Sequence, residues 1–498
     1  MRYLLCACVV MACGPKPASP QLVSVLPDDK PVDAAPAKTP EPKRDDWAGT
    51  LVLPHSLVDI VVHFTERDGT WSATIDVPGT KLVGRELAAV MYTAESIRFT
   101  IPKPENPQLQ ETYVFTRSAD EATGKVLLGG QAFHAKMMKL APGQPALSII
   151  SRPQTPKPPF PYTTKDVNIE VKAAATAADA ASLAGTLTLP EGKGPFPAIV
   201  MISGSGQQDR DETIFGHKPF AVIADRLARD GIATLRTDDR GIGKTTGPLG
   251  SIDTDIADAT AAFQWLIKQP EIDPKRVGLL GHSIGGVIAP FVAVKTGKVA
   301  FIIGLAAPGV SGVELVPMQL ELELGIRKLP DKLIKAIVDG QRAVGKAIVG
   351  GKEAEIKAAL RASFVAAAMA MGAPKPSDAD LDQAIASKMP EVSNPWTISF
   401  FKTDPAKAWA KLTIPVLLVI GDKDTQVPPD QNIARITAAL RKANNKALTT
   451  EKRPGLNHLY QKAQSGTAEE YGELEETFEL ATLDLIAKWA VARTAPKR

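Results

Sequence analysis

Alternating apolar and polar residues beyond position 46 predict a set of short β-strands. Apolar side chains take every second place at Val58, Ile60, Val62 and Phe64, and the alternation returns at positions 71–77 after an Asp-Gly turn. Two alternating runs joined by such a turn are typical of a β-hairpin. Further short runs continue to position 141. Residues 47–141 are therefore predicted to form a small antiparallel β domain.

After a proline-rich linker at residues 142–165, the hydrophobic pattern changes to apolar strands that alternate with helices. This order indicates a mostly parallel sheet whose crossovers are helical. The first two runs, VNIEV and LAGTLTLP, are predicted to open the sheet as an antiparallel pair. A helical segment at about residues 312–403 interrupts the alternation, and the sheet resumes at IPVLLVIGD. The second domain, residues 166–495, is thus an α/β domain with a helical insertion.

The first residues have the pattern of an export signal. One basic residue, Arg2, precedes an apolar run that ends at Ala12. This run is shorter than the roughly 20 residues that span a bilayer, so residues 1–12 are predicted to be a signal peptide. The residues before Cys13 resemble a bacterial lipobox, which implies that Cys13 is lipidated.

Eight prolines between Gly14 and Asp45 predict a disordered tether over residues 13–46. Together with the lipidated cysteine, the tether predicts an exported protein. Its N-terminal lipid would hold it on a bacterial membrane, facing the periplasm or the cell surface.

Composition excludes several classes of function. The 498 residues carry 58 basic and 55 acidic side chains, a net charge of +3, which gives no electrostatic reason to expect nucleic acid as a partner. All three cysteines precede position 14, so the folded part has no disulfide, thiolate zinc site or cysteine nucleophile. The histidines of the β domain lack metal-ligand spacing, and no metal site is predicted; they are His55, His63 and His134.

The strongest chemical motif is GHSIG at residues 281–285. An apolar strand precedes Ser283 and an apolar helix follows it. A nucleophile at such a turn needs a strained backbone, and glycine two residues away on each side removes the crowding. This is the context of a nucleophile elbow, with helix N–H groups directed at developing negative charge.

A serine nucleophile needs a base, and the base needs an orienting carboxylate. In the chain order serine, acid, histidine, the base is His458, because no other histidine follows Ser283. The segment GDKDTQVPP supplies two candidate acids, Asp422 and Asp424. The residues alone leave this choice open.

With these motifs in place, residues 166–495 resemble the α/β-hydrolase family, near its bacterial esterases and serine-aminopeptidase-like members. The segments SGSGQQDRD, DDRGIGKTTG and GDKDTQVPP carry the resemblance beyond the elbow. It implies that Asp424 is the acid, that the insertion is a cap over the active site, and that the backbone N–H groups of Ile284 and Ser205 hold the oxyanion. Ser203 stands where the family has a histidine.

The predicted function is that of a carboxylesterase acting on a small ester, without metal or organic cofactor. An aminopeptidase or other amidase would use the same triad on a peptide-like substrate and is the alternative. A non-catalytic envelope-binding protein, with the β domain as its functional module, is the rival from another class.

The substrate pocket is expected to have an apolar side under the cap and a polar entrance near the SGSGQQDRD loop. Most leucines and methionines of the cap are expected to pack it onto the core, and some are expected to face the pocket. The methionines concerned are Met318, Met369, Met371 and Met389. The run DRDETIFGHKPF either lines the pocket or caps a helix, and its His217 is left out of the triad.

Overall fold

The computed structural model describes residues 43–495, except 79, 81, 103–109, 129–130, 142, 146–148 and 173–179. The described chain divides into two compact units between Ser151 and Arg152. Cys13, the signal peptide and most of the tether lie outside the described residues, so these assignments stay predictions.

The first unit is antiparallel, as the alternation predicts. Its described residues form one sheet in the order β4-β3-β2-β1-β9-β8-β7-β6-β5, and β3 also approaches β5, so that the sheet nearly closes into a barrel. The strands are β1 (Lys43–Leu53), β2 (Ser56–Arg67), β3 (Thr70–Asp76), β4 (Arg85–Glu86), β5 (Ala88–Tyr92), β6 (Ser96–Ile101), β7 (Glu111–Ser118), β8 (Glu121–Leu128) and β9 (Gln131–Lys139).

The hairpin between β2 and β3 follows the expected turn chemistry. Asp68 and Gly69 have φ angles of 50° and 77°, as a tight two-residue turn requires. Alternate residues of both strands enter a core rich in aromatic side chains, with Trp47 and Phe64 fully buried. Residues 43–46, expected in the tether, begin β1 because they pair with β2, Lys43 opposite Glu66.

The second unit has the α/β-hydrolase fold, as predicted. Within the described residues its sheet has the order β10-β11-β13-β12-β14-β15-β16-β17, with β11 antiparallel to both neighbours and the later pairs parallel. The strands are β10 (Thr163–Val171), β11 (Ala181–Leu189), β12 (Phe196–Ile202), β13 (Ala233–Thr237), β14 (Ile272–His282), β15 (Ile302–Leu305), β16 (Val416–Gly421) and β17 (Leu448–Arg453).

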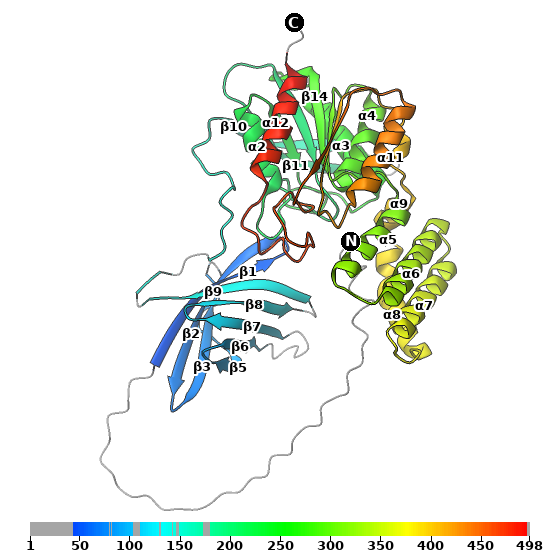
Figure 1. Cartoon of the computed structure of the whole chain (residues 1–498). Coiled ribbons are helices and arrows are strands. Elements are labelled where there is room, and N and C mark those ends of the chain that lie inside the picture. The colour runs from blue at the N-terminus through cyan, green and yellow to red at the C-terminus, as the bar shows by residue number, and fades with distance from the viewer. Residues whose placement is uncertain are drawn as a thin grey trace, which may run out of the picture. The chain divides into compact units, whose positions relative to one another are not determined.

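Helices cover both faces of this sheet (Figure 1). Because successive strand residues point to opposite faces, Ile199 packs in the cluster of α2 (Pro219–Arg229) and α12 (Leu480–Thr494), and Val200 packs in the other. That other cluster contains α3 (Ile252–Leu266), α4 (Ile284–Thr296) and α11 (Pro429–Lys442).

The predicted insertion is helical and lies between β15 and β16. Its first helix begins with a capping box, in which Ser311 and Glu314 satisfy each other's free backbone N–H groups. The helices are α5 (Gly312–Ile326), α6 (Asp331–Gly350), α7 (Glu353–Ala370), α8 (Asp378–Val392) and α9 (Pro395–Lys402), followed by the short α10 (Ala406–Trp409). Figure 1 shows α6, α7 and α8 side by side.

Part of the proline-rich segment packs onto the second unit. The Arg152 guanidinium is buried and donates hydrogen bonds to the carbonyl groups of Phe215, Gly472 and Leu474.

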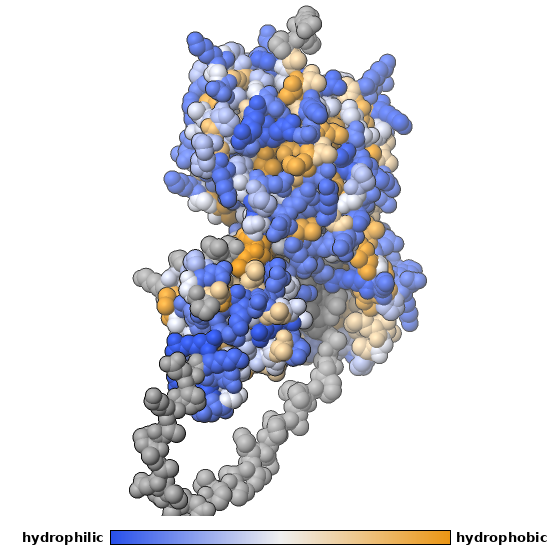
Figure 2. Space-filling view, turned by 60° about the vertical axis from the view of Figure 1, so that its left-hand side comes forward, coloured by the Kyte–Doolittle hydropathy of each residue, from blue (hydrophilic) through white to orange (hydrophobic). Residues whose placement is uncertain are grey.

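Hydrophilic side chains dominate the visible surface (Figure 2). In the part of the chain that the structure describes, no helix combines the length and the apolar character that crossing a membrane requires.

Candidate active site

Ser283 lies at the sharp turn between β14 and α4. Its φ of 53° and ψ of −117° are strained for a residue with a side chain, which costs about 1–3 kcal/mol. A Cβ at Gly285 would clash with the carbonyl oxygen of Ile202, and one at Gly281 would clash with Gly285. The two glycines therefore let the turn pass close to β12 and to itself.

The loop after β12 lies directly beside this serine. A Cβ added to Gly204 would be 3.3 Å from the Cβ of Ser283. The N–H groups of Ile284 and Ser205 donate no hydrogen bond within the described residues, and both residues line the same cavity. Both remain available to a bound oxygen atom.

Asp424 and His458 come together at the ends of β16 and β17. The Nδ1 atom of His458 is 2.8 Å from Oδ2 of Asp424, and both side chains are buried. The other carboxylate oxygen accepts hydrogen bonds from the backbone N–H groups of Gln426 and Val427, each at 2.8 Å. The carboxylate is thus fixed, and it orients the imidazole through Nδ1.

Asp422, the other candidate acid, is exposed and does not contact His458. Its carboxylate accepts a hydrogen bond of 2.6 Å from the N–H of Gly455. The structure therefore brings Asp424, and not Asp422, to the histidine.

His282 lies between Ser283, which follows it in the chain, and the ring of His458. The rings of His282 and His458 are 4.8 Å apart between centroids, and His282 directly precedes the serine. Among the described residues no hydrogen bond joins Ser283 Oγ to His458. Such bonds are often long without substrate and tighten in the complex.

A cavity of about 540 Å³ opens beside Gly204 and Ile284. Ser283 and His458 do not line it themselves, so the cavity adjoins the serine without enclosing it. The cap contributes aromatic side chains from α9, namely Trp396, Phe400 and Phe401.

The expectation that cap methionines face this cavity is wrong. None of the four expected methionines is among the lining residues, and Met369 is 59% exposed. The physical reason is that, of the cap helices, only α9 and the end of α8 contribute residues to the cavity lining, whereas Met369 and Met371 lie on the surface at the end of α7.

One wall of the cavity is acidic. Asp239 accepts hydrogen bonds from Ser203 Oγ and Gln208 N, and Asp255 accepts one of 2.9 Å from Trp396 Nε1. Burial raises the pKa of Asp239 to about 8 and that of Asp255 to about 6. No cationic side chain of the described residues forms an ion pair with either, so the wall holds two carboxyl groups without a cationic partner.

Arg240, a cation that lines the same cavity, is already paired. Its Nε and Nη2 atoms each lie 2.7 Å from a carboxylate oxygen of Asp258. This bidentate pair engages the Arg240 guanidinium and braces the loop after β13.

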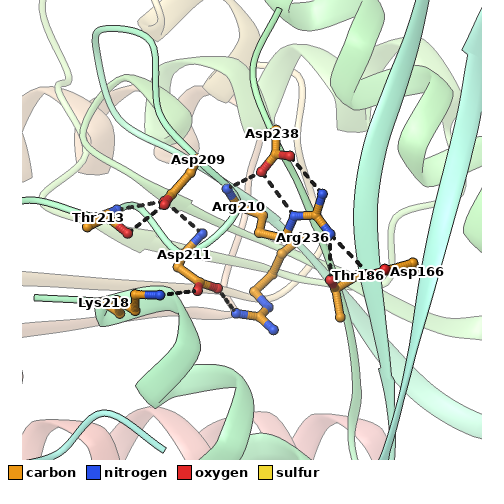
Figure 3. Close-up of polar contacts among 9 residues, drawn as sticks. All are labelled: Asp166, Thr186, Asp209, Arg210, Asp211, Thr213, Lys218, Arg236 and Asp238. Atoms are coloured by element: carbon orange, nitrogen blue, oxygen red, sulfur yellow. Dashed lines mark hydrogen bonds and ion pairs between the residues drawn. The ribbon is translucent and has the colours of Figure 1, made fainter. Parts of the chain in front are cut away.

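The DRDET run after β12 does not line the cavity. Its charged side chains pair with residues of neighbouring segments (Figure 3): Arg210 with Asp238 at 2.7 Å, and Asp211 with both Arg236 and Lys218. The SGSGQQDRD loop therefore lines the cavity through its polar residues Ser203, Ser205 and Gln207, whereas its charged residues hold the loop.

His217 takes no part in this group, in keeping with its omission from the predicted triad. It is buried and bonded to the Thr477 side chain and the carbonyl of Tyr471. Burial, with Arg152 nearby, lowers its pKa to about 3.

Sequence reasoning missed two residues beside the elbow, Glu212 and His282. The two side chains form a buried pair with 2.8 Å between His282 Nδ1 and Glu212 Oε1. They are 70 positions apart, and neither belongs to a hydrophobic repeat. The only available signal was that both lie within motifs already noted, DRDET and GHSIG.

Comparisons with known proteins find relatives among hydrolases. Residues 179–453 match the model of a family described as X-Pro dipeptidyl-peptidase (S15 family). Esterase EstD of Thermotoga maritima is 28% identical over 316 residues, which are 62% of this chain and 65% of that protein. The match thus spans slightly less than two thirds of this relative. An uncharacterised 31.7 kDa protein of Escherichia coli is 25% identical over 256 residues, 51% of this chain and 81% of that protein.

Solved structures with similarity to the chain include esterase Pf2001 of Pyrococcus furiosus, with a TM-score of 0.40 and 15% identity, covering 70% of this chain and 98% of that one. Carboxylesterase EstE1, cloned from a metagenomic library, has a TM-score of 0.40 and 17% identity, covering 67% of this chain and 90% of that one.

Proposed function

We propose that this chain, which belongs to the X-Pro dipeptidyl-peptidase (S15) family, is a serine hydrolase. In this proposal it is a carboxylesterase that cleaves acyl esters with the triad Ser283, Asp424 and His458. The observation that supports the triad best is the buried Asp424–His458 hydrogen bond beside the strained Ser283. The name of the relative EstD, an esterase, supports the choice of ester substrates.

In the proposed reaction, Ser283 Oγ attacks the carbonyl carbon of the ester and passes its proton to Nε2 of His458. The oxyanion of the tetrahedral intermediate accepts hydrogen bonds from the N–H groups of Ile284 and Ser205. Collapse of the intermediate breaks the ester bond, and the leaving alkoxide takes the proton from His458. Water then attacks the acyl-serine with the same histidine as base, which releases the acid and restores Ser283.

The aromatic wall of the cavity predicts how activity depends on acyl length. Each added methylene buried there contributes about 0.8 kcal/mol, so kcat/KM should rise about four-fold per carbon until the cavity is full, and then fall. Trp396→Ala enlarges the cavity and should move the optimum to longer chains. A series of p-nitrophenyl esters from about two to sixteen carbons measures this.

Met369→Ala is the control for that series, since Met369 is an exposed apolar residue of the same cap. Its chain-length profile should equal that of the wild type. A folded Trp396→Ala protein with an unchanged optimum would show that the cavity beside α9 does not hold the acyl group.

One observation favours the second candidate function, an aminopeptidase. The carboxyl groups of Asp239 and Asp255 face the cavity without a cationic partner among the described residues. The free ammonium group of an aminoacyl substrate would supply that cation and would be attracted most strongly by an ionised carboxylate.

A substrate panel separates these functions. It contains p-nitrophenyl esters, aminoacyl p-nitroanilides with a free amine, and the same anilides with an acetylated amine. Turnover of esters alone supports the carboxylesterase, and preference for free amines supports the aminopeptidase. Turnover of none of them would contradict both and favour a binding protein.

For the aminopeptidase, Asp255→Asn should lower kcat/KM for free-amine anilides at least about ten-fold, the worth of one ion pair of about 1.4 kcal/mol. In the wild type this activity should rise as pH increases through about 6, because Asp255 becomes ionised there. Hydrolysis of the neutral acetyl ester serves as the control, and an equal loss on both substrates would contradict a role in amine binding.

A further inference from the structure

His282 places both of its ring nitrogens against oxygen atoms. Nδ1 is 2.8 Å from Glu212 Oε1, and Nε2 is 3.0 Å from the carbonyl oxygen of His458. His282 and Glu212 are only 6% and 3% exposed, so water does not replace these bonds.

These contacts fix where the protons are. The carbonyl oxygen of His458 can only accept, so Nε2 must carry a hydrogen. A neutral imidazole with its hydrogen on Nε2 has no hydrogen on Nδ1, so the hydrogen bond between Nδ1 and Glu212 requires a second proton, which the two side chains share. His282 therefore keeps its hydrogen bonds to Glu212 and to the His458 carbonyl together only while that second proton is present.

The groups around His282 favour this proton. Burial alone would lower the pKa of His282, but the Glu212 carboxylate and, more weakly, Asp424 raise it overall. The other titratable groups that face the ring are His458 and Tyr460. Tyr460 is neutral, because burial raises the pKa of its phenol well above the usual range.

The same carboxylate oxygen also holds the loop beside the serine. Glu212 Oε1 accepts a hydrogen bond of 2.6 Å from the N–H of Gly204, the residue before Ser205. Glu212 Oε1 thus bonds both to the loop that contains Ser205 and to His282 at the end of β14. His282 in turn bonds to the backbone carbonyl of His458.

The backbone around Glu212 is built to hold this side chain in place. Glu212 has a φ of 53°, which is costly for a residue other than glycine. Before Glu212 in the chain, Arg210 is paired with Asp238 and Asp211 with Arg236 (Figure 3). After it, Thr213 donates hydrogen bonds from its backbone N–H and its hydroxyl to the carboxylate of Asp209. These contacts anchor both flanks of the residue, whose side chain is directed to His282.

We propose that the buried Glu212–His282 pair is a positioning device that holds the Ser205 loop, the Ser283 elbow and the His458 backbone together as one unit. The inference rests on the proposed serine hydrolase function. Neither residue touches the reacting atoms in this account; both act through Gly204 and His458.

The decisive variant is Glu212→Gln. The amide oxygen of glutamine can still accept from Gly204 and from His282, but the negative charge is lost, and the pKa of His282 falls. Above that lowered pKa, His282 has one hydrogen and loses one of its two links. The ratio of variant to wild-type kcat should therefore be near one at low pH and fall about 10- to 100-fold as pH rises, with KM unchanged.

His282→Gln is the second variant, because its side chain does not titrate. It cannot replace both links, so its kcat should be reduced at every pH by a constant factor. A His282→Gln protein with wild-type kcat overturns the inference, even if Glu212→Gln does not fold. His217→Gln is the control for losing a buried histidine, and its kcat ratio should not vary with pH.

A spectroscopic readout follows the proton directly. In ¹⁵N-histidine NMR at about pH 8, wild-type His282 should retain both ring N–H signals, assigned by their absence in His282→Gln, and Glu212→Gln should lose one. Two retained signals together with a pH-independent kcat ratio in Glu212→Gln overturn the proposal.

Labelling of Ser283 by a fluorophosphonate separates the hypothesis of a serine hydrolase from the hypothesis that the Glu212–His282 pair has a positioning role. No labelling refutes the hydrolase function, and normal labelling with a constant ratio refutes the positioning role alone.

Discussion

Replacing Ser283 with alanine is expected to lower kcat by about 10⁶ and to abolish labelling by a fluorophosphonate probe. The size of the effect follows from losing the covalent intermediate, since the residual rate would come only from the oxyanion donors and from binding. Labelling detected by mass spectrometry of the modified peptide measures the first effect, and ester hydrolysis measures the second.

Two comparisons make this result specific. Ser118→Ala removes an exposed serine of β7 and should retain full labelling. His458→Ala should still contain Ser283 but react far more slowly, because no base remains to take the proton. A Ser283→Ala protein that is labelled as fast as the wild type would show that the nucleophile lies elsewhere.

The second large effect is expected for Asp424→Asn, at about 10⁴ in kcat. Asparagine can present its NH₂ group to Nδ1 of His458, which favours the tautomer with its hydrogen on Nε2. That tautomer cannot accept the serine proton. Circular dichroism and thermal unfolding should first establish that the variant is folded.

Asp422→Asn is a closely matched control, two residues away in the same turn. Its side chain accepts one hydrogen bond, from Gly455 N, and the oxygen of an amide can accept it equally. The expected loss of kcat is less than about three-fold, a small fraction of a kcal/mol. If Asp422→Asn costs more than Asp424→Asn, the acid of the triad is misassigned.

The sequence predicted the features of the site that depend on residues close together in the chain. The turn at Ser283 needs glycine on both sides, and the apolar runs on either side determine which elements it joins. The choice between Asp422 and Asp424 has a local cause as well. Only Asp424 has the N–H groups of Gln426 and Val427 at the spacing that fixes its carboxylate.

The Glu212–His282 pair could not be predicted in the same way. A buried charge leaves no periodic pattern in the sequence, and the partners meet only because β12 and β14 are neighbours in the sheet. The register of those strands brings the loop after one to the last residue of the other. Such contacts follow from tertiary structure, and a motif shows only one partner at a time.

The sequence correctly predicted an apolar cavity wall under the cap, but the residues that form this wall are not the expected methionines. Apolar side chains of the cap do line it, but they come from the segment PWTISFF. Trp396 and Phe400 lie one helical turn apart there and stack on each other at 5.4 Å. Helical spacing alone does not tell which of several cap helices reaches the sheet.

The position of the cap in the chain has an evolutionary consequence. The helical insertion begins with α5 and ends with α9, and a Cβ added at Gly312 in α5 would clash with the ring of Phe400 in α9. The two ends of the insertion are therefore close together, so an insertion of different length can be accommodated at little cost in chain entropy. The proposed nucleophile precedes this site, and the proposed acid and base follow it in the segments after β16 and β17, which the sheet holds in place. Selection can thus exchange or remodel the cap, and with it the range of substrates, while the catalytic groups stay where they are.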